Sequence, residues 1–380
     1  MMFQPLVVWC IFFCSGIVAG YYCRLPPVLL CAAVAAVSCA AFCLRNKRQC
    51  AYLVFCLAAL LGALDIAGAR PIPSSSQAVK TVLGLKHKIE GLISDRLNPP
   101  FSNILSAMVL GERRMVPEDL RQAMMKAGTW HLMVVSGTHT AIVAAIVLLL
   151  LKAVRVGRNM RFISAIVLLI VYCLLTGASS SVVRATVMTS VYLLTYLFKR
   201  PPNFLNSLAM AALAILIFDP TQLFQVGFQL SFLSVFFIFW LYPGLKNIFP
   251  AGIWKSRYLC VPANCFCVSL SACIGTAPLL AHVFNTFSCI SIIANIVAAP
   301  LAALVMAGGL VLIGFGALLP VCAGPAALSA EFFIFLFVKM NMAFAGLPWA
   351  SIHVPRTRLF WVVFCYFITL FLSRLFPRKQ

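Results

Sequence analysis

Acidic residues are scarce in this sequence: Asp and Glu number eight among 380 residues, against 29 Lys and Arg, for a formal net charge of +21. Charged residues of both signs make up only 10% of the chain, and 63% of it is hydrophobic. A soluble core does not absorb that much apolar sequence, so the composition predicts an all-α, polytopic membrane protein. Alternation of apolar and polar residues is missing from the apolar runs, which excludes a transmembrane β-barrel.

Motifs of metal and nucleotide chemistry are missing as well. The five histidines are scattered and no His-x-His-x-Asp-His run occurs, so we expect no two-metal nuclease site. No Gly-Lys-Ser/Thr phosphate loop occurs, so we expect no motor within the chain. Most of the 16 cysteines lie inside apolar runs, and Cys265 and Cys267 form a CxC without a second pair at zinc spacing. We predict no metal site and no cofactor.

Long apolar runs divide the chain into ten to twelve predicted membrane spans. Their approximate bounds are 3–22, 28–44, 51–69, 130–151, 162–177, 182–198, 204–218, 222–243, 259–281, 288–319, 326–346 and 359–376. The run 288–319 is too long for one untilted helix and contains Pro300 and Gly308-Gly309. A broken or re-entrant element is therefore expected there.

The interval 70–127 is polar and separates the spans of 1–69 from a membrane domain at 128–380. From Val79 to Leu97 apolar residues recur at helical spacing with basic residues on other faces, which predicts an interfacial amphipathic helix. Two shorter helices are expected to begin near Phe101 and near Pro117.

The basic residues between spans indicate the orientation. With the amino terminus inside, the Lys and Arg of the loops at 45–48, 152–161, 199–200 and 246–257 all face the cytoplasm, as the positive-inside rule requires. The interval 70–127 then lies outside, where the positive-inside rule does not predict its excess of basic residues. Attraction to DNA phosphates or to anionic lipid headgroups explains the excess equally well. The basic residues in question are Lys80, Lys86, Lys88, Arg96, Arg113 and Arg114.

Residues 128–140 read GTWHLMVVSGTHT and place polar groups at the start of a long apolar run. Ionisable groups at membrane depth are costly and mark functional sites by default. On one continuous helix Ser136 and His139 share a face, and His131 lies about 80° round from His139. The alternative is a hydroxyl bonded to its own i−4 carbonyl beside two packed interfacial histidines.

Two further blocks carry polar groups within apolar surroundings. Ser180 and Ser181 open a helix whose first turn contains Arg184, a combination able to hold one phosphate or, alternatively, a capped helix with a snorkelling arginine. Gln225 and Gln229 lie one turn apart and predict a polar stripe facing another helix or a water-filled path. Asn295 follows a break rich in Ser and Cys.

GTWHLMVVSGTHTAIV closely resembles the Gly-Thr-x-His-Leu-Leu-x-Ile-Ser-Gly-Leu-His signature of the ComEC-type competence proteins. GERRMVPEDLRQAMMKAG before it and three later blocks agree with that family in order and spacing: SSSVVRA, DPTQLFQVGFQLSFLSV and APLLAHVFNTFSCISIIANIVAAPL. Together the blocks cover roughly residues 105 to 305. Thr138 departs from the pattern, because the family carries a bulky aliphatic residue there.

The resemblance implies an inner-membrane, multi-pass channel without catalytic residues that passes single-stranded DNA into the cytoplasm during natural transformation. The implied path is lined by His131, Ser136, Gly137, His139, Ser180, Ser181, Arg184, Gln225, Gln229 and Asn295. Full-length relatives add an OB-type domain and often a metallo-β-lactamase-like nuclease domain, neither of which is expected here. The implied partners are membrane lipids, a cytoplasmic helicase or translocase and a periplasmic DNA receptor. Whether the chain forms a homo-oligomer stays open.

Two alternatives come from other functional classes. A transporter of a small anion or a lipid-linked phosphate would use the same Arg184 and helix termini. An intramembrane serine hydrolase would use Ser136 as nucleophile and His139 as base. Against the hydrolase, Ser and His at i and i+3 of one helix rarely align for proton transfer, and the sequence shows no orienting acid.

Overall fold

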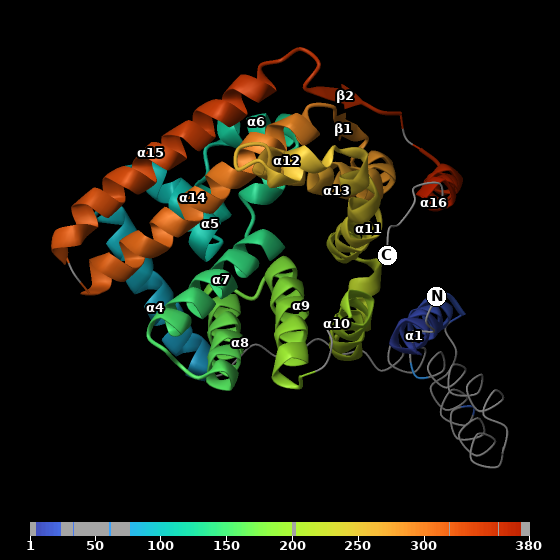
Figure 1. The fold of residues 1–380 in the computed structure, drawn as a ribbon, viewed down its shortest axis with the longest axis horizontal. Helices are drawn as coiled ribbons and strands as arrows, with labels where there is room; N and C mark the ends of the chain where they lie inside the picture. Colours follow the sequence, from blue (N-terminus) through green and yellow to red (C-terminus); the bar gives the residue numbers. More distant parts are fainter. Residues whose placement is uncertain are drawn as a thin grey trace. The chain divides into compact units, whose positions relative to one another are not determined.

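The computed structural model describes residues 5–23, 33, 61, 77–199, 203–318, 320–355 and 357–373. Nearly all of the described chain is helical (Figure 1), which confirms the predicted all-α class. The chain divides into two compact units: unit 1 holds Met1–Ser75 and Val187–Phe232, and unit 2 holds Ser76–Thr186 and Leu233–Gln380.

Seven helices of the described residues are long and apolar enough to cross a membrane, which makes this a multi-pass membrane protein. The spans are Leu6–Cys23, Trp130–Ala153, Arg158–Leu175, Val226–Ile248, Cys260–Phe284, Ser291–Gly314 and Ala323–Ala345. The number falls short of the predicted ten to twelve partly because α10 (Phe204–Phe218) has only 15 residues, and α16 (Leu359–Ser373) is described over 15 residues. The predicted spans 28–44 and 51–69 lie outside the described residues.

Unit 1 is built around the pairing of α1 (Pro5–Cys23) with α10. Its core joins Phe13 and Ile17 of α1 to Leu213 and Leu216 of α10. After α10, Asp219 accepts a hydrogen bond from the Thr221 backbone N–H at 3.1 Å and so starts the short helix η3 (Pro220–Phe224). η3 leads directly into α11 (Val226–Ile248), which continues into unit 2.

Unit 2 is centred on α14 (Ser291–Leu318) and α15 (Pro320–Ala345), which lie side by side in Figure 1. Gly308 of α14 allows close contact, since a Cβ there would lie 3.6 Å from the Ala330 Cα of α15. α14 is one helix of 28 residues that contains Pro300, so the expected break is wrong. Pro300 cannot donate the backbone hydrogen bond of a regular helix. Packing of α14 against α13 (Cys260–Phe284) and α15 keeps the helix continuous there.

The helices predicted within 70–127 are present as α4 (Gln77–Ser94), α5 (Phe101–Leu110) and α6 (Glu118–Ala127). They do not form a separate surface layer, because α4 contacts α8 (Arg158–Leu175) and α14, and α6 packs against α15. α5 is mostly buried, and Gly309 of α14 leaves room for its Leu105: a Cβ at 309 would lie 2.5 Å from Leu105 Cδ1. An apolar helix of ten residues needs such cover, which an interfacial position does not provide.

A two-stranded sheet ties together the loops at one end of unit 2. β1 (Thr286–Ser288) pairs antiparallel with β2 (Ser351–His353), with Phe287 opposite Ile352. The Ser288 hydroxyl also donates to the Lys126 carbonyl at 2.8 Å, which brings the end of α6 to the same place. The predicted topology assigns these three segments to the same side of the membrane, and in the structure they lie together. That this side faces outward stays a prediction. The short helix α12 (Ala251–Lys255) links α11 to α13.

Candidate functional site

The stretch 128–140 is a structured loop followed by a helix start, and not the continuous helix predicted. α6 ends at Gly128, whose φ of 71° lies in the left-handed region that favours glycine. The short helix η2 (Trp130–Leu132) follows, and α7 (Gly137–Ala153) begins only after an extended Ser136. His131 and His139 therefore belong to different elements, and the predicted angle between them on one helix is wrong.

Ser136 is the N-cap of α7, and His139 folds back onto it. The Ser136 backbone N–H donates to His139 Nδ1 at 3.3 Å, and Ser136 Oγ lies 3.0 Å from the same nitrogen. This is a capping box in which a histidine takes the position usually held by Glu or Gln. Because Nδ1 accepts a hydrogen bond, the proton of the neutral imidazole belongs on Nε2.

The Nε2 atom of His139 is buried and has no hydrogen-bond partner, and the residue as a whole is only 1% exposed. A buried N–H donor without an acceptor carries a cost of about 1–3 kcal/mol. Such groups call for an explanation in terms of function or of a bound molecule. Gly137 and Thr138, the first residues of α7, are by contrast exposed.

Buried contacts fix the loop to the long helices. The Thr129 hydroxyl donates to Asn341 Oδ1 of α15, and Asn341 Nδ2 donates to the Phe337 carbonyl at 2.7 Å. At Gly128 a Cβ would lie only 2.6 Å from the Ser291 Cβ of α14. The loop can pass this point only with glycine, so the polar stretch is rigidly placed against α14 and α15.

The predicted group of Ser180, Ser181 and Arg184 comes together at the first turn of α9 (Ser180–Leu197). The Arg184 guanidinium donates to Ser180 Oγ through one terminal nitrogen and to Ser181 Oγ through the other, the second at 3.1 Å. Arg184 is 2% exposed, so it does not snorkel to the surface in this conformation. A positive charge is therefore held beneath the amino terminus of α9.

The start of α7 approaches the start of α9 at one point. A Cβ at Gly137 would lie 3.9 Å from the Ala185 Cβ of α9. A Cβ at Gly111, in the turn after α5, would lie 3.2 Å from the Thr176 carbonyl oxygen and 3.7 Å from Val135 Cγ2. The segments around Gly111, around Val135 and Gly137, and from Thr176 to Ala185 therefore lie close together. Helix amino termini carry unused N–H groups and positive partial charge, so the place attracts anions.

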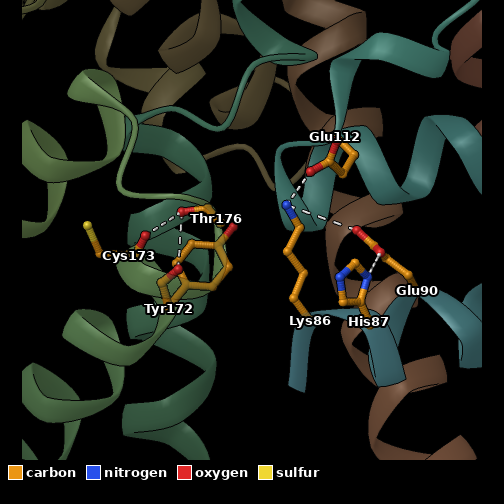
Figure 2. Close-up of polar contacts among 7 residues, drawn as sticks. All are labelled: Lys86, His87, Glu90, Glu112, Tyr172, Cys173 and Thr176. Atoms are coloured by element: carbon orange, nitrogen blue, oxygen red, sulfur yellow. Dashed lines mark hydrogen bonds and ion pairs between the residues drawn. The ribbon is translucent and has the colours of Figure 1, made fainter. Parts of the chain in front are cut away.

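Lys86 supports this arrangement from α4 (Figure 2). It is 8% exposed, its Nζ pairs with Glu112 in the turn after α5, and Glu90 lies 4.0 Å away. Lys86 is thus buried and ion-paired, so its amine is not available to contact DNA in this conformation. Lys88, Arg96, Arg113 and Arg114 are exposed, as that role requires, while Lys80 lies in α4.

The remaining predicted path residues lie elsewhere. Gln225 lies just before α11, so it does not form a polar stripe with Gln229 on one helix. Gln229 Nε2 instead donates a hydrogen bond to the Leu223 carbonyl of η3 at 3.0 Å. Both belong to unit 1. In unit 2, His131 is exposed, and Asn295 on α14 has a buried Oδ1 without a hydrogen-bond partner. Thr129, Asn341 and the Lys86–Glu112 pair were missed, because partners far apart in sequence leave no local signal.

No cluster suited to metal binding occurs in the part of the chain that the structure describes. The class is thus a multi-pass helical membrane protein with helix amino termini and a buried arginine gathered at one end of unit 2. The chain belongs to the competence protein family, whose model matches residues 108–379.

One curated relative is the ComE operon protein 3 of Bacillus subtilis (strain 168), which is 30% identical over 219 residues. The alignment covers 58% of this chain and 27% of the relative, so the chain spans about a quarter of that protein's length. No solved structure matches the chain.

Proposed function

We propose that this protein is an inner-membrane channel through which single-stranded DNA enters the cytoplasm during natural transformation. Membership of the competence family supports a role in DNA uptake, and the partial similarity to ComE operon protein 3 agrees with it. The observation that carries the proposal is the approach of Gly137, at the start of α7, to Ala185 of α9, the residue next to buried Arg184.

The chemistry of this place suits a passing phosphate. Backbone N–H groups of two first turns supply partial positive charge, and Arg184 adds a full charge whose direction Ser180 and Ser181 fix. Because Arg184 is buried, it acts on a phosphate through the local potential and not by direct contact in this conformation. A single cation attracts the strand without binding it too tightly to move, which a conducting path requires.

The scarcity of acidic residues also favours the passage of a negatively charged strand. No Asp or Glu occurs between Asp219 and Glu331, so 111 successive residues carry no fixed negative charge to repel a strand. The exposed residues Lys88, Arg96, Arg113 and Arg114 would gather DNA before entry. Pulling would come from a cytoplasmic helicase or translocase, and delivery from a DNA receptor outside the membrane.

Uptake of labelled DNA tests the proposal. A strain that lacks the protein is complemented with the parent chain, with Arg184→Gln or with Arg257→Gln, which removes an exposed arginine elsewhere in unit 2. At matched expression, Arg184→Gln should leave labelled DNA outside the cytoplasm, and Arg257→Gln should not. Normal delivery by Arg184→Gln would contradict the channel site. Loss of phosphate transport with intact DNA delivery would favour the small-anion transporter.

One specific observation favours a second candidate, the serine hydrolase: Ser136 Oγ lies 3.0 Å from His139 Nδ1. The pair meets because Ser136 is the cap and not part of the helix, so the argument that the two do not align fails. A triad would also need an acid on Nε2, and that atom has no partner. Labelling of the purified protein with a fluorophosphonate, compared with Ser136→Ala, tests this candidate directly.

A further inference from the structure

The start of α16 carries a pocket that the proposed channel does not use. It has a volume of about 370 Å³ and is lined by Val354, Pro355, Thr357, Arg358 and Trp361. Its position is fixed from α13: His282 Nδ1–H donates to the Thr357 carbonyl at 2.7 Å, and the Asn285 carbonyl accepts from the Val354 N–H at 2.9 Å. The pocket is therefore built into the junction of α13 and α16.

The polar side chains of the pocket, Thr357 and Arg358, have no hydrogen-bond or ion-pair partner among the described residues. The Thr357 hydroxyl is buried without a hydrogen bond, and exposed Arg358 forms no ion pair with any described residue. Most of the remaining lining is apolar, with exposed Trp361 at the rim. One cation, one free hydroxyl and an indole over an apolar floor match a phosphate attached to a hydrophobic body.

An exposed aromatic row leads away from the pocket along α16. Phe360, Phe364, Phe367 and Phe371 are all exposed and follow one another at helical spacing. Eleven residues of helix rise about 16 Å, which equals roughly half of the 30 Å hydrocarbon thickness, the depth of one leaflet. The opposite face of α16 is occupied, because Tyr366 donates to the Gly275 carbonyl of α13 at 3.0 Å.

We propose that this pocket and the aromatic row bind one anionic phospholipid. Its phosphate pairs with Arg358, its glycerol region meets Thr357 and Trp361, and an acyl chain lies along the aromatic row. The match in length between the row and one leaflet favours a lipid over a nucleic acid, whose bases and phosphates do not extend into hydrocarbon. The lipid holds α16 against α13 and thereby stabilises this corner of unit 2.

Native mass spectrometry of the full-length protein in detergent tests the site. Phosphatidylglycerol, phosphatidylcholine and a short single-stranded oligonucleotide are each titrated against the parent, Arg358→Gln, Thr357→Val and Arg257→Gln. Arg257 serves as the control because it is exposed and does not line this pocket. We expect the parent to retain one phosphatidylglycerol and to retain phosphatidylcholine more weakly. Arg358→Gln should lower the affinity for phosphatidylglycerol about tenfold, Thr357→Val should lower it less, and Arg257→Gln should leave it unchanged.

A second readout guards against loss of folding. Phosphatidylglycerol should raise the melting temperature of the parent and of Arg257→Gln, but not that of Arg358→Gln, while all three melt alike without lipid. Equal lipid retention by the parent and Arg358→Gln would overturn the proposal. So would an oligonucleotide that displaces phosphatidylglycerol and loses affinity in Arg358→Gln, because the pocket would then bind nucleic acid.

Discussion

Lys86 and Glu112, 26 residues apart, form an ion pair that joins α4 to the turn after α5. That turn contains Gly111, which lies against Thr176 at the end of α8 and against Val135 just before the cap of α7. The ion pair therefore anchors α4 to a turn that packs against two other segments of the candidate site. A buried amine that loses its partner is costly, so the pair also sets a stability requirement.

Reversing the charge of Lys86 tests this role. Lys86→Glu should destabilise the protein by about 2 kcal/mol, because two carboxylates would then face each other at a largely buried position and Glu112 would keep only part of its solvation. Lys88→Glu, an exposed change on the same helix, should alter stability by less than about 0.5 kcal/mol. The melting temperature of the purified protein in detergent measures both. Failure of Lys86→Glu combined with Glu112→Lys to recover stability would contradict the pairing.

Gly128 offers a test of the close approach at the loop. Gly128→Ala should lower the stability of the fold more than Gly177→Ala, although both residues have a positive φ, of 71° and 77° respectively. At Gly177 nothing lies within 4 Å of an added Cβ, so only backbone strain of about 1–2 kcal/mol is expected. At Gly128 the same strain is joined by a clash with Ser291 and Ser288. Equal melting temperatures for the two variants would show that the loop is not pinned against α14.

Sequence patterns predicted the local elements of this region well, and their packing poorly. Pro117 with Glu118 correctly indicated the start of α6, and apolar spacing from Val79 indicated α4. Burial of α5 was missed, because an apolar pattern does not say which surface covers it. The cap at Ser136 was missed because the position three residues on holds His139, not the Glu or Gln of the usual signature. Thr129 and Asn341 lie 212 residues apart, so only the fold reveals their contact.

The exposed basic residues before the loop give a prediction on DNA capture. Changing Lys88, Arg96, Arg113 and Arg114 together to glutamine should weaken capture most at low salt, because phosphate contacts release counterions and are screened as salt rises. Lys86 is left unchanged, since its amine is engaged with Glu112. Binding of labelled DNA to intact cells at several salt concentrations is the measurement. Unchanged capture at every concentration would assign these residues to lipid headgroups instead.

The predicted orientation is tested by labelling cysteines introduced into a background without native cysteines. Position 114, in the turn after α5, should react with an impermeant maleimide added to intact cells, and position 157, between α7 and α8, only after permeabilisation. Both positions are exposed, so accessibility alone does not separate them. The opposite pattern would place the exposed basic residues in the cytoplasm, and their role in capturing DNA from outside would fail.

The last prediction ranks three substitutions where the start of α7 approaches α9. Arg184→Leu should reduce cytoplasmic DNA delivery most, because it removes the only full charge held there by Ser180 and Ser181, while an apolar side chain at a buried position keeps the fold stable. His139→Leu should come next, since it removes both the buried Nε2 donor and the bond to the Ser136 N–H.

Ser136→Ala should be mild in this ranking, because the cap loses a hydroxyl worth about 1 kcal/mol and nothing else changes. Arg184→Lys is the matched control: it keeps the charge but loses the two-pronged contact with the serines, so delivery should fall less than in Arg184→Leu. The measurement is labelled DNA in the cytoplasm at equal expression of each variant. A nucleophile cannot be replaced without losing nearly all turnover. Abolished delivery in Ser136→Ala with a silent Arg184→Leu would therefore reject the channel mechanism in favour of covalent catalysis.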